Sequence, residues 1–176
     1  LLDKTTNSLI NNLLWGLGFA FIVISLIVGL MFRSFKMIFI ALVVNVIPLV
    51  FMAGIMGILG IYLKSDTSII FDISFGIVVD DTIHFLSKLR IELAKGRTMR
   101  YAVKRSYLTT GKAIILTTLI LLAGFLTLLF SSFDGAFYTG LLISISLVLG
   151  MIMDLFLLPI LILILCKEKR VPANFF

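Results

Sequence analysis

The sequence predicts an all-α membrane protein, a bundle of five transmembrane helices with one amphipathic helix on its cytoplasmic side. Of the 176 residues, 61% are hydrophobic and 14% are charged, and the mean hydropathy is +1.21. Soluble domains contain about 45–50% apolar and about 25% charged residues, so much of this apolar surface has to face lipid. The apolar runs are continuous, whereas the strands of a membrane β-barrel would alternate in polarity.

Five apolar segments are long enough to cross the hydrocarbon core, which takes about 20 residues of helix. The first two contain no charged residue, and the third is weaker because it holds three aspartates and a histidine. The fifth is so long that a helix over it would tilt or protrude from the bilayer. The predicted spans are residues 13–31, 37–61, 69–86, 113–130 and 138–166.

The connection between the third and fourth spans, residues 88–112, is too polar to cross a membrane. Gly96 interrupts it, Thr98 is a suitable cap for a helix from Met99 to Thr110, and Gly111 would end that helix. Tyrosine and leucine alternate there with arginine and lysine, which is typical of a helix lying on a membrane face. The alternative is a loop that simply carries the positive charge of the cytoplasmic side.

The basic residues orient the predicted bundle. Thirteen of the fifteen lysines and arginines fall on one side of it, and only Lys4 and Lys64 fall on the other. Lysine and arginine are enriched on the cytoplasmic side, which predicts a multi-pass protein of the inner (plasma) membrane with its N-terminus outside and its C-terminus cytoplasmic. These residues separate apolar runs and form no nucleic-acid-binding motif, so nucleic acid is not an expected partner.

The third span carries the residues with the clearest chemistry, Asp80 and Asp81. An ionised aspartate at mid-bilayer costs at least about 2.5–3.5 kcal/mol, and two neighbours also repel each other. The pair therefore needs a protein interior or a wet path, together with protonation or a cationic partner. His84 lies one helical turn after Asp80 and can share a proton with it, while Gly76, one turn before, thins the same helix face for packing. The alternative places the pair, or His84 alone, at the membrane interface.

Two threonines of the fourth span, Thr117 and Thr118, are candidate partners for a carboxylate at similar depth. The alternative is that they bond the carbonyls of their own helix, as threonines in membrane helices usually do. Asp154 in the fifth span and Asp72 in the third have no assigned role. The single histidine and the single cysteine exclude multi-histidine and thiolate metal motifs, and neither a metal nor another cofactor is predicted.

Residues 76–81 read G-x-x-x-D-D and are followed by Thr-Ile-His-Phe. With Asn-Val-Ile-Pro at 45–48, Thr-Thr at 117–118 and Asp-Leu-Phe-Leu-Leu-Pro at 154–159, the chain resembles resistance-nodulation-division (RND) exporters over essentially its whole length. It is similar in particular to the MmpL-like and hopanoid-exporter-like branch, which is related to the sterol-sensing domain of Patched and Dispatched.

The resemblance implies that residues 1–176 form a single transmembrane domain, a fragment of a larger transporter. Such exporters have two membrane halves, each with five helices after a large extracytoplasmic domain, and this chain looks like the C-terminal set of five. The expected partners are membrane lipids, the other half and that domain, with a homo-oligomer as a further expectation.

In function, the resemblance implies export of lipids or other hydrophobic substrates driven by the proton-motive force, with Asp80 and Asp81 as the proton relay. His84, Thr117 and Thr118 would pass the protons on or adjust how the relay binds them. The alternative is a sterol-sensing-like module that binds lipid without transport. An enzyme is not expected, because the G-x-G-D signature of intramembrane aspartyl proteases and the G-x-S-x-G signature of serine hydrolases are absent.

Overall fold

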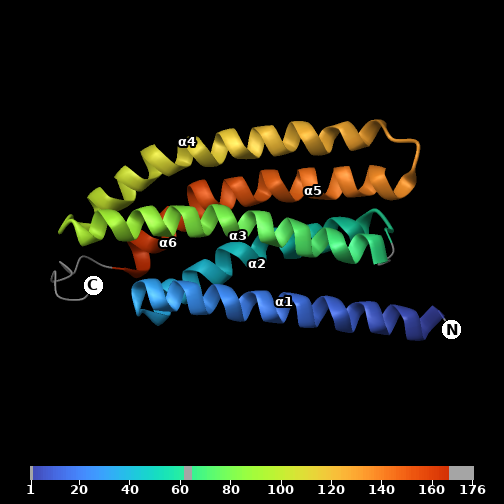
Figure 1. Ribbon diagram of the computed structural model, residues 1–176, viewed down its shortest axis with the longest axis horizontal. Helices are drawn as coiled ribbons and strands as arrows, with labels where there is room; N and C mark the ends of the chain where they lie inside the picture. The colour runs from blue at the N-terminus through green and yellow to red at the C-terminus, as the bar shows by residue number, and fades with distance from the viewer. Residues whose placement is uncertain (1, 62–64, 167–176) are drawn as a thin grey trace.

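The computed structural model describes residues 2–61 and 65–166, and its long helices lie side by side with their connections at alternate ends (Figure 1). The described residues contain no strand, so the predicted all-α class is confirmed. A 3₁₀ turn, η1, extends α4, and a π-helical turn, η2, joins α5 to α6 without a break. The elements are α1 (Leu2–Phe32), α2 (Phe35–Ile58), α3 (Ser65–Ala94), α4 (Met99–Leu126), η1 (Thr127–Phe130), α5 (Asp134–Ile152), η2 (Met153–Leu157) and α6 (Leu158–Leu165).

Within the part of the chain that the structure describes, four stretches of helix are long and apolar enough to cross a membrane, which supports a multi-pass membrane protein. They are Leu13–Phe32, Phe35–Ile58, Met99–Phe130 and Asp134–Leu165. Because α3 contains polar residues, it is less apolar than these four stretches. It nevertheless lies among the other helices and contacts α1, α2, α4 and α5 (Figure 1). Its 30 residues would extend about 45 Å, more than the hydrocarbon thickness. The count of five spans remains a prediction.

The region between the third and fourth spans differs from the expected separate amphipathic helix. Gly96, in the left-handed region at φ 73°, follows the end of α3, and α4 begins at Met99 after an extended Thr98. The expected end at Gly111 is wrong, because α4 runs through it without interruption. Gly111 serves packing: it is buried, and a Cβ there would lie 3.2 Å from Leu155 Cδ2. Residues 88–112 therefore belong partly to α3 and partly to α4.

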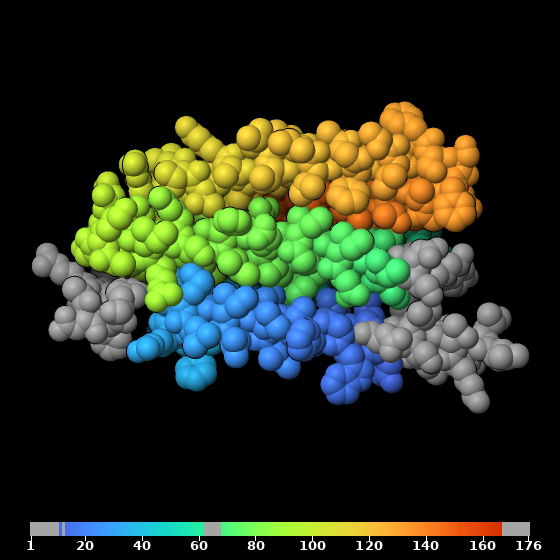
Figure 2. All heavy atoms as spheres, in the orientation of Figure 1, coloured from blue at the N-terminus to red at the C-terminus, as the bar shows by residue number. Residues whose placement is uncertain are grey.

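The core lies around α3. Phe85, Leu86 and Leu89 of α3 are completely buried, as are Ile40 of α2 and Leu142 of α5. Large apolar side chains elsewhere point outward, as lipid-facing side chains do in a membrane protein. Figure 2 shows one face of the molecule, on which α3 lies between α1 and α4. This arrangement leaves one side of α3 open at the surface while its other side faces the interior.

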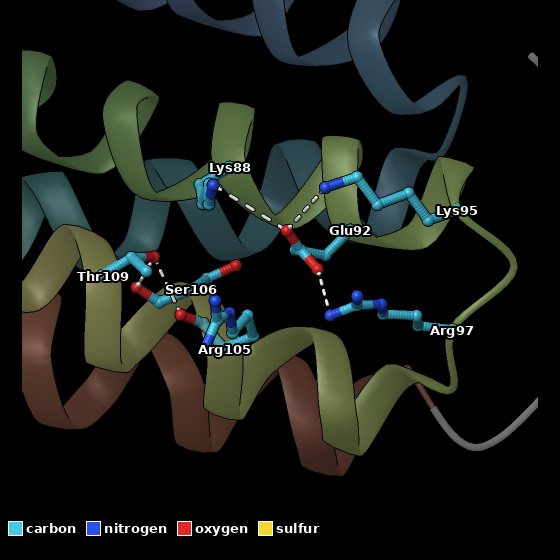
Figure 3. Close-up of polar contacts among 7 residues, drawn as sticks. All are labelled: Lys88, Glu92, Lys95, Arg97, Arg105, Ser106 and Thr109. Atoms are coloured by element: carbon cyan, nitrogen blue, oxygen red, sulfur yellow. Dashed lines mark hydrogen bonds and ion pairs between the residues drawn. The ribbon is translucent and has the colours of Figure 1, made fainter.

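A buried carboxylate holds the turn between α3 and α4 (Figure 3). Glu92 is 2% exposed, and its Oε1 lies 3.2 Å from Lys95 Nζ and 3.8 Å from Lys88 Nζ. Its Oε2 lies 2.8 Å from Arg97, whose guanidinium also covers the Tyr101 ring at 4.6 Å from the ring centroid. These contacts connect the last turns of α3 to the first turn of α4, so they help to set how the two helices diverge.

The Glu92 cluster should make the turn sensitive to acid. Desolvation works to raise the pKa of Glu92, but the hydrogen bond from Lys95 and the charges of Arg97, Lys95 and Lys88 outweigh it and hold that pKa below its ordinary value of 4.5. With the folded pKa lowered, the stabilisation is fully present above pH 4.5 and is lost as the pH falls through the folded pKa. We expect deuterium exchange at residues 95–98, corrected for its intrinsic pH dependence, to accelerate over that acidic range.

The matched control for this prediction is Glu92→Gln, which keeps the shape of the side chain but not its charge. It should expose the turn to exchange already at neutral pH and remove the acid dependence. If residues 95–98 were equally protected from deuterium exchange in the two proteins at every pH, the ion pairs of Glu92 would not stabilise the turn.

Candidate functional site

A groove of about 450 Å³ lies between α3 and α4 and holds most of the predicted site residues. Asp80, Asp81 and His84 line it from α3, and Thr110 and Thr117 line it from α4. The remaining lining residues are apolar. The structure therefore brings together two carboxylates, an imidazole and two hydroxyls at the edge of an apolar groove.

The two aspartates have different surroundings, as their separation of about 100° around a helix predicts. The Asp80 side chain is 70% exposed, and its Oδ1 lies 3.8 Å from Nε2 of the His84 side chain, which is 69% exposed. That distance is too long for a hydrogen bond. Asp81 is half-buried. Asp80 and His84 thus form an outward-facing pair, and Asp81 lies closer to the interior.

The other predicted residues are less closely associated with the acids. Thr117 Oγ1 lies 3.0 Å from the carbonyl oxygens of Ala113 and Ile114, so the hydroxyl bonds its own helix, as the alternative reading expected. Thr118 is buried at 3% exposure and is not among the residues that line the groove. A Cβ at Gly76 would meet nothing within 4 Å. The close helix packing expected at Gly76 is therefore not made within the described part of the chain.

A second polar cluster lies inside the bundle and was not predicted. Asp154 of η2, Thr82 of α3 and Asn45 of α2 are all 0% exposed. Thr82 Oγ1 donates to Asp154 Oδ1 at 2.6 Å, and Asn45 Nδ2 donates to Thr82 Oγ1 at 3.1 Å and to the Ala41 carbonyl at 2.7 Å. One signal did point here: each of the three is a polar residue in an apolar run and lies in or next to a motif that carries the family resemblance.

The two clusters lie on different sides of α3. Asp81 lines the groove, whereas the adjacent Thr82 points into the bundle toward Asp154. A single turn of α3 therefore connects a surface acid pair to a buried acid. Over residues 2–61 and 65–166, no group of three or more histidine, cysteine, aspartate or glutamate side chains is arranged to hold a metal ion. The groups that are present can carry protons and hydrogen bonds.

Comparison with known proteins identifies the family to which the chain belongs. The model of the MMPL family matches residues 10–174. A protein of Methanocaldococcus jannaschii, named only as a membrane protein, is 29% identical over 125 residues, which cover 71% of this chain and 32% of that protein. The matched region is thus about a third of the relative's length. Because the family model covers nearly the whole sequence, this chain belongs to the MMPL family, whose members are membrane transporters.

Proposed function

We propose that this chain is the membrane portion of an RND-type exporter that is driven by the proton-motive force and moves lipids or other hydrophobic molecules. The observation that carries the proposal is the groove between α3 and α4, where Asp80, Asp81 and His84 meet on a helix that packs against four other helices. Carboxylates in a membrane region are costly and usually mark ion or substrate pathways. Here they are the groups that bind and release the driving proton.

The geometry supports a short relay along α3. His84 follows Asp80 by one turn, toward the end of α3 where the basic turn begins. If that end is cytoplasmic, as the charge distribution predicts, a proton taken up at Asp80 or Asp81 moves inward by passing to His84. Thr117 lines the same groove, and its hydroxyl would have to turn from the Ala113 and Ile114 carbonyls to donate to a carboxylate. The N-terminus is then outside and the C-terminus cytoplasmic, in the cell membrane.

The exposure of Asp80 and His84 supports a further protein surface on this face. Side chains about 70% exposed would meet lipid if α3 were left uncovered, and charged groups in membranes instead face protein or water. Gly76 lies one turn away on the same face with open space beside it, which leaves room for a close neighbour. We assign this surface to the other membrane half of the transporter.

One observation favours the alternative of a sterol-sensing-like module that binds lipid without pumping. The groove is lined largely by isoleucine, leucine and alanine, which suits a lipid chain as well as a proton path. Proton flux separates the two functions. The intact protein, reconstituted in vesicles with a pH-sensitive dye inside, should dissipate an imposed pH gradient faster than protein-free vesicles when lipid substrates are present. A lipid-binding module would leave the gradient at the rate of the empty vesicles.

A further inference from the structure

Asp154 is a buried acid that the proposed relay does not use. Its side chain is 0% exposed, and it lies on the π-helical turn η2 between α5 and α6. One carboxylate oxygen accepts the 2.6 Å hydrogen bond from Thr82, while the other, Oδ2, is buried without a hydrogen-bond partner. An ionised carboxylate can accept about four hydrogen bonds, so the ionised form is poorly satisfied here and a proton on Oδ2 relieves the cost of burying the charge.

The hydrogen bonds around Asp154 all run in one direction. Asn45 has two amide hydrogens, and the geometry directs one to the Ala41 carbonyl and one to Thr82 Oγ1. Thr82 has a single hydroxyl hydrogen, for which Asp154 Oδ1 at 2.6 Å competes with Asn45 Oδ1 and the Val78 carbonyl, both at 3.4 Å. The shortest contact takes that hydrogen. The chain of donors therefore ends on Oδ1 and leaves Oδ2 as the place where a proton can bind.

Within the described residues, no basic group is among those that act on Asp154. The elements that contact η2 include α2, α3, α5 and α6. The α4 helix also reaches η2 where Gly111 lies against Leu155, and Lys112 beside that contact is exposed. On α2 the charged residue is Lys36, which donates to the Leu165 carbonyl at the far end of α6. The described α3 side chain that acts electrostatically on Asp154 is Asp81, which carries the same sign of charge. The charge of α5 is Asp134 at its opposite end, and α6 has no charged residue. Protonation is thus the means by which the site reaches neutrality.

The position of η2 allows this proton to affect helix packing. Gly150 of α5 and Asp154 of η2 are four residues apart. They face Val78 and Thr82 of α3, which are also four residues apart, so the two pairs stack along one interface. A Cβ at Gly150 would lie 2.6 Å from Val78 Cγ2, which shows how closely α3 and α5 approach just before η2. Pro159 has no N–H for the carbonyl of Leu155, so the α-helical ladder is already interrupted at this turn. Such π turns are common at functional sites.

We propose that Asp154 is a second proton-binding site of the transporter, which through Thr82 links the charge state of the groove acids on α3 to the position of α6. Asp81 and Thr82 are consecutive, so a change of α3 that accompanies proton binding in the groove also moves the donor to Asp154. When Asp154 is ionised it draws Thr82 closer, and when it is protonated that attraction weakens. The proposal deepens the proposed proton coupling and rests on it, but its test is separate.

The test is infrared spectroscopy of the intact protein in lipid vesicles, which detects the C=O stretch of protonated carboxyl groups. In the wild type, lowering the pH should make a band appear that is missing in Asp154→Asn, a substitution that keeps the side-chain shape and the acceptor for Thr82. Bands from Asp80 and Asp81 are identified by the corresponding asparagine variants. If difference spectra of wild type and Asp154→Asn coincide over the whole pH range in which the protein is folded, the proposal is wrong.

Thr82 variants provide a second measurement in case Asp154→Asn does not fold. Thr82→Val removes the donor at nearly constant volume and should move the Asp154 band to higher frequency, because the C=O loses its hydrogen bond. Thr82→Ser keeps the hydroxyl and should leave the band in place. Thr118→Val, at another buried threonine, is the matched control and should not move it. An unmoved band in Thr82→Val would overturn the link. Neither result depends on the vesicle proton flux, so failure of the two proposals can be told apart.

Discussion

Replacing Asp80 and Asp81 together by asparagine is expected to reduce export by the intact transporter to background, without changing its amount in the membrane. Asparagine keeps the size of the side chain and its capacity for hydrogen bonds, so the groove between α3 and α4 should retain its shape. It cannot bind and release a proton near neutral pH, and a proton-driven cycle then has no driving step. Export is measured in cells or vesicles with an imposed proton gradient, beside an immunoblot of the membrane fraction.

Asp72→Asn is the matched control for the double variant. Asp72 is also an exposed aspartate of α3, but it faces α1, where a Cβ on Gly16 would lie 3.4 Å from its Oδ1, and it does not line the groove. This variant should export as the wild type does. Full export by the Asp80→Asn, Asp81→Asn protein would rule out the relay, and an equal loss in Asp72→Asn would show that the effect is not specific to the groove.

Gly140→Ala should destabilise the bundle strongly. A Cβ at this α5 position would lie 2.7 Å from the carbonyl oxygen of Phe125 and 2.7 Å from Leu128 Cβ. A backbone carbonyl cannot rotate away as a side chain can, so α5 and the end of α4 would have to separate. Overpacking of this kind costs about 1–3 kcal/mol, of which the better helix propensity of alanine returns up to about 1 kcal/mol. The thermal midpoint in detergent should fall.

Gly124→Ala is the control for this substitution, because it lies on α4 close to the same contact and a Cβ there would meet nothing within 4 Å. Its stability should be unchanged or raised by up to about 1 kcal/mol through helix propensity. If the two alanine variants melt at the same temperature, the contact between Gly140 and the Phe125 carbonyl is not as close as described.

The sequence was most informative where local rules determine structure. Continuous apolar runs predicted the helices, and Gly96 marked the end of α3, since only a residue tolerant of positive φ suits that position. Gly111 was misread because the same residue type also serves close packing. Nothing local distinguishes a glycine that ends a helix from one that lies against Leu155 of a distant element.

The candidate site was predictable only in part, for a similar reason. Asp80, Asp81 and His84 lie within two turns of one helix, so their proximity follows from helical geometry. The buried cluster depends on tertiary structure: Asn45 and Asp154 are 37 and 72 residues from Thr82 along the chain. Their contact requires α2, α3 and the α5–α6 segment to pack in a particular register, which no pattern in the separate runs specifies.

The π-helical turn also affects which side of α6 faces the core. A π turn takes up about one residue more than an α turn, and each residue of a helix corresponds to a rotation of about 100°. The π turn Met153–Leu157 absorbs that extra residue within one turn, so α6 keeps its buried side toward the core, where Leu158 and Ile162 are completely buried. A further inserted residue that the turn did not absorb would rotate both side chains by about 100° toward lipid.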